Sequence, residues 1–175
     1  MDANPYQFDL LDDEDGTLSY TFSSDNGAVY SVYFNIREYD HYIDTYPHLF
    51  NKGYGFGFFQ MTRPIHKKKL DERINQTIEN IISNFFATHG NEVVLLFHCD
   101  YSDSRQMCRD KLFTGWYNNS QEKDNYKRER YEATITETGV THFMGFITLN
   151  SNPHLELVQL EFDACSFNLM QQKIT

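Results

Sequence analysis

The chain has 175 residues, of which 40% are hydrophobic and 16% aromatic, and its formal net charge at pH 7 is −10. This composition excludes a disordered chain, and the length suits one domain able to bury about two-thirds of its unfolded surface. The acidic balance opposes broad nucleic-acid affinity, because non-specific binding depends on neutralising phosphates. The 12 Tyr and 15 Phe favour sheet surfaces over a helical bundle.

The cysteines, Cys99, Cys108 and Cys165, are widely spaced and form no C-x-x-C motif. The sequence therefore predicts neither a disulfide framework nor a zinc knuckle, and a reducing compartment fits it best. The N-terminus lacks the basic and apolar regions of a signal peptide, and no apolar run approaches the roughly 18 residues that span a bilayer. We expect a cytoplasmic protein without membrane contact.

Residues 1–17 are rich in acids and predict a solvated arm, with an arm that masks a partner's basic site as the alternative. Residues 18–175 then form a single domain. Alternation over residues 18–22 and 29–36, around the turn sequence Ser24-Asp25-Asn26-Gly27, predicts a β-hairpin.

Residues 54–61 predict a third strand. The Gly-x-Gly-x-Gly spacing that begins at Gly53 resembles a nucleotide-binding loop, but aromatic alternation continues through it. We interpret these as strand glycines that let neighbouring rings or backbone approach closely.

Residues 70–86 predict a helix that ends at Gly90. Its apolar stripe has helical spacing and consists of Leu70, Ile74, Ile78, Ile81, Ile82, Phe85 and Phe86.

Residues 93–97 are continuously apolar and predict a strand near the centre of the sheet. A second helix follows over residues 102–117, with Cys108, Leu112 and Trp116 on one face. Residues 118–130 are polar and predict a loop.

Residues 131–137 and 140–149 predict a second hairpin with its turn at Thr138-Gly139. The tail over residues 154–170 is ambiguous between strand and helix. Together these elements predict an α+β domain with one largely antiparallel sheet, covered by two main helices on one face. Their order along the chain is β-β-β-α-β-α-β-β plus the tail.

The junction after the central strand concentrates titratable residues. His98, Asp100 and Asp103 are metal-ligand types within six residues. The structural interpretation is favoured, because a metal site normally recruits a ligand from elsewhere in the chain. In that interpretation Ser102 or Asp103 is the helix N-cap, and Asp100 accepts from Arg105 or Arg109.

Nucleophilic catalysis is poorly supported. His98 and Cys99 are adjacent on a strand and point to opposite faces, so they cannot pair directly. Cys108 lies on the apolar stripe of its helix, where cysteine behaves as a small hydrophobic residue.

Arg105 and Arg109 are spaced i, i+4 at the start of a helix and together suit a phosphate or carboxylate clamp. The commoner outcome is an internal ion pair with Asp100, Asp103 or Asp110. Trp116 is likewise more often a core anchor than a platform that stacks on a ligand.

Two basic runs stand against the acidic background, and solvated charge is the default for both. If they met in space, they would suit nucleic acid or an acidic partner. The runs span residues 63–69 and 123–130, and the candidate patch residues within them are Arg63, Lys67, Lys68, Lys69, Lys127, Arg128 and Arg130.

The centre of the domain reads Leu95-Leu96-Phe97-His98-Cys99-Asp100, then Asp103-x-Arg105, then Arg109-x-x-Leu112-Phe113-x-x-Trp116. The preceding helix carries Asp71-x-Arg73-Ile74 and Thr77-Ile78. Together with the N-terminal hairpin, this pattern resembles a small uncharacterised bacterial family, a domain of unknown function found mainly in Bacteroidota. The resemblance implies a bacterial cytoplasmic protein and no particular reaction.

Two functions from different classes stay open. The first is a non-catalytic protein-interaction or regulatory module, such as an accessory component of a toxin–antitoxin or anti-phage system, that binds another protein or itself as a homo-oligomer. The second is an anion- or nucleotide-binding or hydrolytic domain built on Asp100, Asp103, Arg105 and Arg109. We favour the first, because no catalytic constellation in the sequence is complete. We expect no cofactor, no metal and no binding to duplex DNA.

Overall fold

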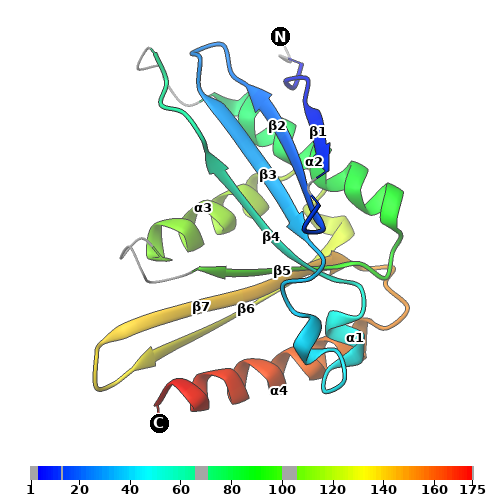
Figure 1. Cartoon of the computed structure of the whole chain (residues 1–175), viewed down its shortest axis with the longest axis vertical. Coiled ribbons are helices and arrows are strands. Elements are labelled where there is room, and N and C mark those ends of the chain that lie inside the picture. The colour runs from blue at the N-terminus through cyan, green and yellow to red at the C-terminus, as the bar shows by residue number, and fades with distance from the viewer. Residues whose placement is uncertain (1–3, 13, 66–70, 100–105, 175) are drawn as a thin grey trace.

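A single sheet runs through the computed structural model of the chain (Figure 1). The structure describes residues 4–12, 14–65, 71–99 and 106–174, apart from the side chains of residues 106–109, 112, 135 and 170–174. Within these residues the strands are β1 (Asp9–Asp12), β2 (Thr17–Ser23), β3 (Val29–Asn35), β4 (Gly53–Gln60), β5 (Val94–Cys99), β6 (Tyr126–Ile135) and β7 (Val140–Leu149). The helices are α1 (Pro47–Phe50), α2 (Glu72–His89), α3 (Gln106–Asn119) and α4 (Leu155–Ile174), with short 3-10 turns η1 (Asp40–Tyr42) and η2 (Lys123–Asn125).

The strand order is β1-β2-β3-β4-β5-β7-β6. The pair β4–β5 is parallel, and the other neighbouring strands are antiparallel. A parallel pair needs a crossover connection, and α2 occupies that position in the chain. The predicted α+β class, the largely antiparallel sheet and the order of its main elements are confirmed.

The first core forms where α2 packs on the sheet. The predicted stripe is confirmed at its described positions, because Ile78, Ile81, Ile82, Phe85 and Phe86 are buried and Ile74 packs partly buried against them. The Asp71 carboxylate caps the start of α2 by accepting from the Arg73 backbone N–H. At the other end Gly90 has φ +98°, which only glycine adopts without strain, so it stops the helix as predicted.

The glycines of β4 allow close contacts, as predicted. A Cβ on Gly57 would collide with the Tyr33 ring of the neighbouring strand β3, and one on Gly53 would collide with the Leu49 carbonyl. These glycines therefore serve packing across the strand rather than phosphate binding.

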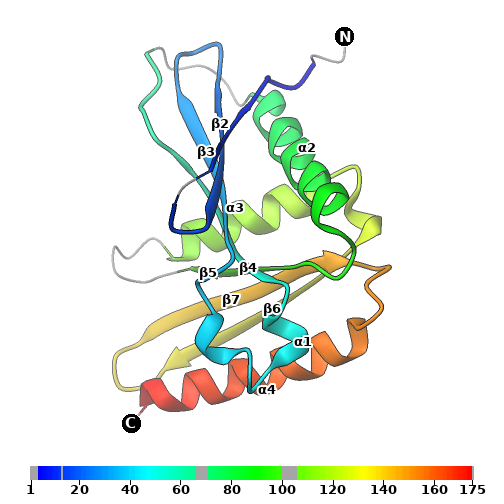
Figure 2. The same cartoon turned by 45° about the vertical axis from the view of Figure 1, so that its right-hand side comes forward.

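Helices cover both faces at the centre of the sheet, which corrects the prediction of helices on one face. Along β5, Leu95 and Phe97 belong to the core beneath α2 and α3, whereas Val94 and Leu96 belong to a second core beneath α1 and α4. A strand that is apolar on both faces needs cover on both faces. The ambiguous tail supplies this cover as α4, which lies across β6 and β7 on the side opposite α3 (Figure 2).

The acidic N-terminal segment is tied to the domain through one aromatic residue. Tyr6 is 8% exposed, and its backbone N–H donates to Thr77 Oγ1 of α2 at 2.8 Å. Its hydroxyl donates to Asp71 Oδ2 at 2.6 Å. Farther along this segment, β1 adds an exposed edge strand to β2.

Residues 126–130, predicted as part of a polar loop, lie instead on β6. This strand pairs with β7 over its whole length, from Tyr126 opposite Leu149 to Ile135 opposite Val140. The prediction was wrong here because β6 is an edge strand, and charged side chains are common on sheet edges, where they discourage pairing with other chains.

Candidate functional site

The end of β5 carries the first of the predicted site residues. His98 is exposed and Cys99 is buried, so the predicted alternation of these two side chains is confirmed. The His98 ring lies parallel to that of His142 on β7, with 6.2 Å between ring centroids. Residues Asp100, Asp103 and Arg105 lie outside the described residues, and so does the Arg109 side chain. The junction as a ligand site stays a prediction.

Trp116 lies inside the protein. It is 4% exposed and belongs to the core that α2 and α3 share with the sheet. Its position agrees with a core anchor, and burial leaves no face of the indole open for stacking on a ligand.

The described members of the second basic run are engaged with neighbouring side chains. Arg130 donates to both carboxylate oxygens of Asp110 on α3, at 2.6 and 2.8 Å, and this bonding raises the pKa of the guanidinium. Lys127 pairs with Glu129 at 3.2 Å. These cations are neutralised within the fold, which disfavours a phosphate-binding strip along β6.

Arg128, like Arg130, lies between β6 and α3. Its guanidinium donates to Thr114 Oγ1 at 2.9 Å and lies 5.5 Å from the centroids of both Phe97 and Tyr117. Burial lowers its pKa.

The first basic run lies away from the second. Arg63, its described member, follows β4, and β5 and β7 separate that strand from β6. Lys67, Lys68 and Lys69 lie outside the described residues.

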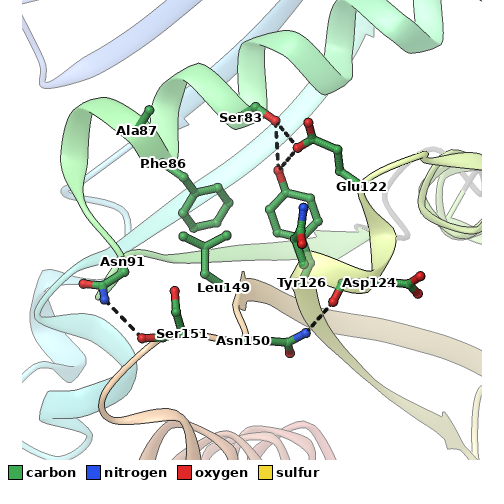
Figure 3. A pocket seen from close by; sticks show the side chains of 11 residues that line it. Ser83, Phe86, Ala87, Asn91, Glu122, Asp124, Tyr126, Leu149, Asn150 and Ser151 are labelled. Carbon is green, nitrogen blue, oxygen red and sulfur yellow. Dashed lines mark hydrogen bonds between the residues drawn. The ribbon is translucent and has the colours of Figure 1, made fainter.

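A pocket of about 520 Å³ opens between the C-terminal half of α2, η2 with the start of β6, and the end of β7 (Figure 3). The apolar side chains Phe86, Ala87 and Leu149 form one part of its lining. The remainder of the lining is polar and consists of Ser83, Asn91, Glu122, Asp124, Asn125, Tyr126, Asn150 and Ser151.

Hydroxyl and carboxylate groups meet at one end of this pocket. Ser83 Oγ donates to Glu122 Oε2 at 2.6 Å, and the Tyr126 hydroxyl lies 3.0 Å from Ser83 Oγ and 3.3 Å from the same carboxylate oxygen. Burial raises the pKa of Tyr126 to about 12, so its phenol stays protonated at neutral pH. The cluster joins α2 to η2 and β6 (Figure 3).

The chemistry of the pocket lining is limited. Among the described residues, the lining contains two carboxylates and no Lys, Arg, His or Cys. Within that same set, no imidazole lies beside Ser83 to act as a general base. An anion would meet only hydroxyl and amide donors and two like charges. The described lining thus lacks the paired base and the cations that nucleophilic catalysis and anion binding ordinarily use.

A second pocket of about 230 Å³ lies between α1 and the start of α4. Glu161 of α4 closes this region by accepting from the Leu49 backbone N–H at 2.8 Å and by contacting His48 Nδ1 at 2.7 Å. Glu92 lies 3.6 Å from His154 Nε2. No group of three or more His, Cys, Asp or Glu side chains in the described part of the chain could hold a metal. These contacts fasten α1 to α4.

The outer side of α4 carries a second apolar stripe. Its sheet-facing side buries Val158, Phe162 and Cys165, and burial raises the pKa of the Cys165 thiol to about 11. On the opposite side Leu157 is 42%, Leu160 65% and Phe167 56% exposed, and Ala164 is also exposed. In both views α4 forms the lower margin of the molecule, with its outer side turned away from the sheet (Figures 1 and 2). No described helix is long and apolar enough to cross a membrane.

Residues 70–164 match the model of DUF6169, a family of unknown function. The chain belongs to the DUF6169 family. The matched range of this DUF6169 protein includes the pocket of Figure 3 and three of the four outer apolar residues of α4. No curated protein and no solved structure matches the chain.

The outer stripe of the DUF6169 chain was not predicted from the sequence, although the spacing of its residues indicates it. Leu157, Leu160, Ala164 and Phe167 follow one another at intervals of three, four and three residues. This spacing indicates one face of a helix, and the buried residues between them indicate a second. The pocket has no comparable signal, because its lining comes from three segments far apart in the chain.

Proposed function

We propose that this DUF6169 protein is a non-catalytic protein-binding module whose partner docks on the outer face of α4, defined by Leu157, Leu160, Ala164 and Phe167. The observation that carries the proposal is that α4 is apolar on two opposite sides, while the sheet covers one of them. A helix that is apolar all round is ordinarily buried. Clustered exposed apolar side chains mark interaction surfaces.

For the biological setting we propose a bacterial, cytoplasmic protein that acts as a regulatory or accessory component, of the kind found in toxin–antitoxin or anti-phage systems. The support is the sequence resemblance to an uncharacterised bacterial family, together with a pocket whose described lining offers no nucleophile with its base. A protein that acts by docking needs a surface and no reaction centre.

Arg130 and Lys127, two described basic residues of the second run, favour no second function. The Arg130 guanidinium is already held by Asp110 through two hydrogen bonds, and Lys127 is paired with Glu129. An incoming phosphate would have to displace these carboxylates.

Quantitative affinity capture tests the proposal. The tagged full chain is expressed in cells of the source organism, and co-purified proteins are compared by mass spectrometry with those of Leu160→Gln. Leu160 is 65% exposed, so the substitution alters the outer face without opening the core. The matched control is Ile65→Gln, which removes another apolar side chain that is 77% exposed.

We expect Leu160→Gln to lose at least one partner that both the wild type and Ile65→Gln retain. Circular dichroism and thermal melting verify that both variants fold. The proposal fails if Leu160→Gln and Ile65→Gln retain the same set of proteins as the wild type.

A further inference from the structure

The outer face of α4 has the geometry of a helix-packing seam. The intervals of three, four and three between Leu157, Leu160, Ala164 and Phe167 are those of the a and d positions in a coiled coil. A second helix laid along such a seam covers every member of it at once. A loop or a flat sheet would match this narrow stripe less well.

Acidic side chains border this seam. Glu156 and Asp163 lie seven residues apart on one edge, and both are exposed. Among the described residues neither has an ion-pair partner. Glu161 lies on the other edge, where it is half-buried and bonded to His48 and to the Leu49 backbone N–H of α1. In coiled coils the residues in these bordering positions select the partner by charge.

The border opposes pairing with a second copy of the chain. In a parallel pair Glu156 of one copy would find no cation on the opposite edge of the other, because Glu161 occupies that edge and is bonded to α1. In an antiparallel pair Asp163 would face an acid of the same edge. Like charges in apposition cost binding energy, and each copy also carries a net charge of −10.

We infer that the outer face of α4 receives an amphipathic helix of a partner protein, with an apolar seam bordered by lysine or arginine. This inference rests on the proposed function and adds the chemistry of the partner. Lysine or arginine beside the partner's seam would face Glu156 and Asp163, and the partner's leucine-like residues would cover Leu160 and its neighbours.

Designed peptides test the inference directly. A fluorescein-labelled helical peptide as long as α4, 20 residues, carries leucine at the seam and lysine at the bordering positions. A second peptide keeps the leucine seam and places glutamate at the borders. Fluorescence anisotropy measures the Kd of each peptide for the full chain and for three variants: Leu160→Gln, Glu156→Gln with Asp163→Asn, and Asp9→Asn with Asp12→Asn.

We expect the lysine peptide to bind more tightly than the glutamate peptide, and added salt to weaken it. Leu160→Gln should raise its Kd by at least about tenfold, as the loss of a central apolar contact does. The change at Glu156 and Asp163 should also raise the Kd. The control pair on β1 has the same change in net charge at exposed acids and should leave the Kd unchanged.

Several outcomes would overturn the inference. Equal affinity for the two peptides, or equal effects of the two acid-pair variants, would show that the border does not select by charge. A chain that is dimeric by light scattering, and monomeric as Leu160→Gln, would make a second copy the occupant. If neither peptide binds while affinity capture still depends on Leu160, the partner's chemistry is wrong and the proposed function stands.

Discussion

At the scale of single residues, the most strongly bonded polar side chains join elements of the fold. Asp110 holds Arg130 of β6 against α3. Tyr126 and Glu122 join α2 to η2 and β6 through Ser83. These groups are satisfied by one another, as buried polar groups ordinarily are. Their substitution should therefore affect stability first.

Asp110→Ala should destabilise the fold, because it leaves the Arg130 guanidinium without its bidentate acceptor. Asp110 is 7% exposed, but the Arg130 side chain is 31% exposed and retains contact with water. We expect a loss of about 1–3 kcal/mol in the free energy of unfolding, measured by urea denaturation. The control Glu132→Ala removes the more exposed partner of the same arginine and should change stability by less than about 0.5 kcal/mol. Equal midpoints for the two variants would contradict this role of Asp110.

The pH dependence of stability, compared between wild type and Tyr126→Phe, tests whether the phenol of Tyr126 is buried. The folded pKa of Tyr126, about 12, lies above the unfolded value of 10.0. The neutral phenol therefore contributes stability that is complete below pH 10 and is lost as the pH rises toward about 12. The stability difference between wild type and Tyr126→Phe should be constant near neutral pH and shrink over this alkaline range. Urea denaturation at each pH measures it, and a difference that stays constant throughout would contradict the burial of this phenol.

At the scale of elements, α4 has one apolar side on the sheet and a second apolar side that is exposed. Phe162 packs against Phe146 of β7, with 5.0 Å between ring centroids, and is 1% exposed. Leu160, two residues earlier, projects from the opposite side. The inner face holds the helix on the sheet, and the outer face is the surface on which we propose that a partner docks.

Alanine substitutions on the two faces should separate these roles. Phe162→Ala should cost about 3–5 kcal/mol of unfolding free energy, because it leaves a cavity in the core. Leu160→Ala should change stability by less than about 0.5 kcal/mol, because its side chain is 65% exposed. Thermal melting of both variants measures the difference. A large loss in Leu160→Ala would mean that the outer face supports the fold itself.

At the scale of the whole molecule, both edges of the sheet carry charge. On β1 the exposed Leu10 and Leu11 lie between Asp9 and Asp12, and β6 carries Lys127, Glu129 and Glu132. Charged edges discourage strand-to-strand association. This charge on both edges supports the proposal that a partner docks on the outer face of α4.

The net charge of −10 predicts that the protein does not bind duplex DNA appreciably at about 0.15 M salt. The Asp110–Arg130 pair adds to this expectation, because it occupies a cation that DNA would need. A mobility-shift titration measures binding. Saturable micromolar binding that weakens steeply with salt, and that is lost when Lys67, Lys68 and Lys69 are replaced, would contradict it.

The sequence by itself determined the elements whose apolar pattern is periodic and whose ends are marked. The stripe from Ile74 to Phe86 with Gly90 at its end predicted α2, and the run from Val93 to Phe97 predicted β5. Turn chemistry at Asn26-Gly27 and Thr138-Gly139 predicted the two hairpins. Local sterics and burial control these features, so a local pattern is sufficient to find them.

The tertiary structure alone decided which segments meet. Arg130 is bonded to Asp110, twenty residues away, and the pocket joins α2 to η2 and the end of β7. The tail forms a helix, and this helix covers the second apolar face of β5 and β7. These contacts depend on packing between segments that are distant in the chain. A local sequence pattern does not encode the free energy of that packing.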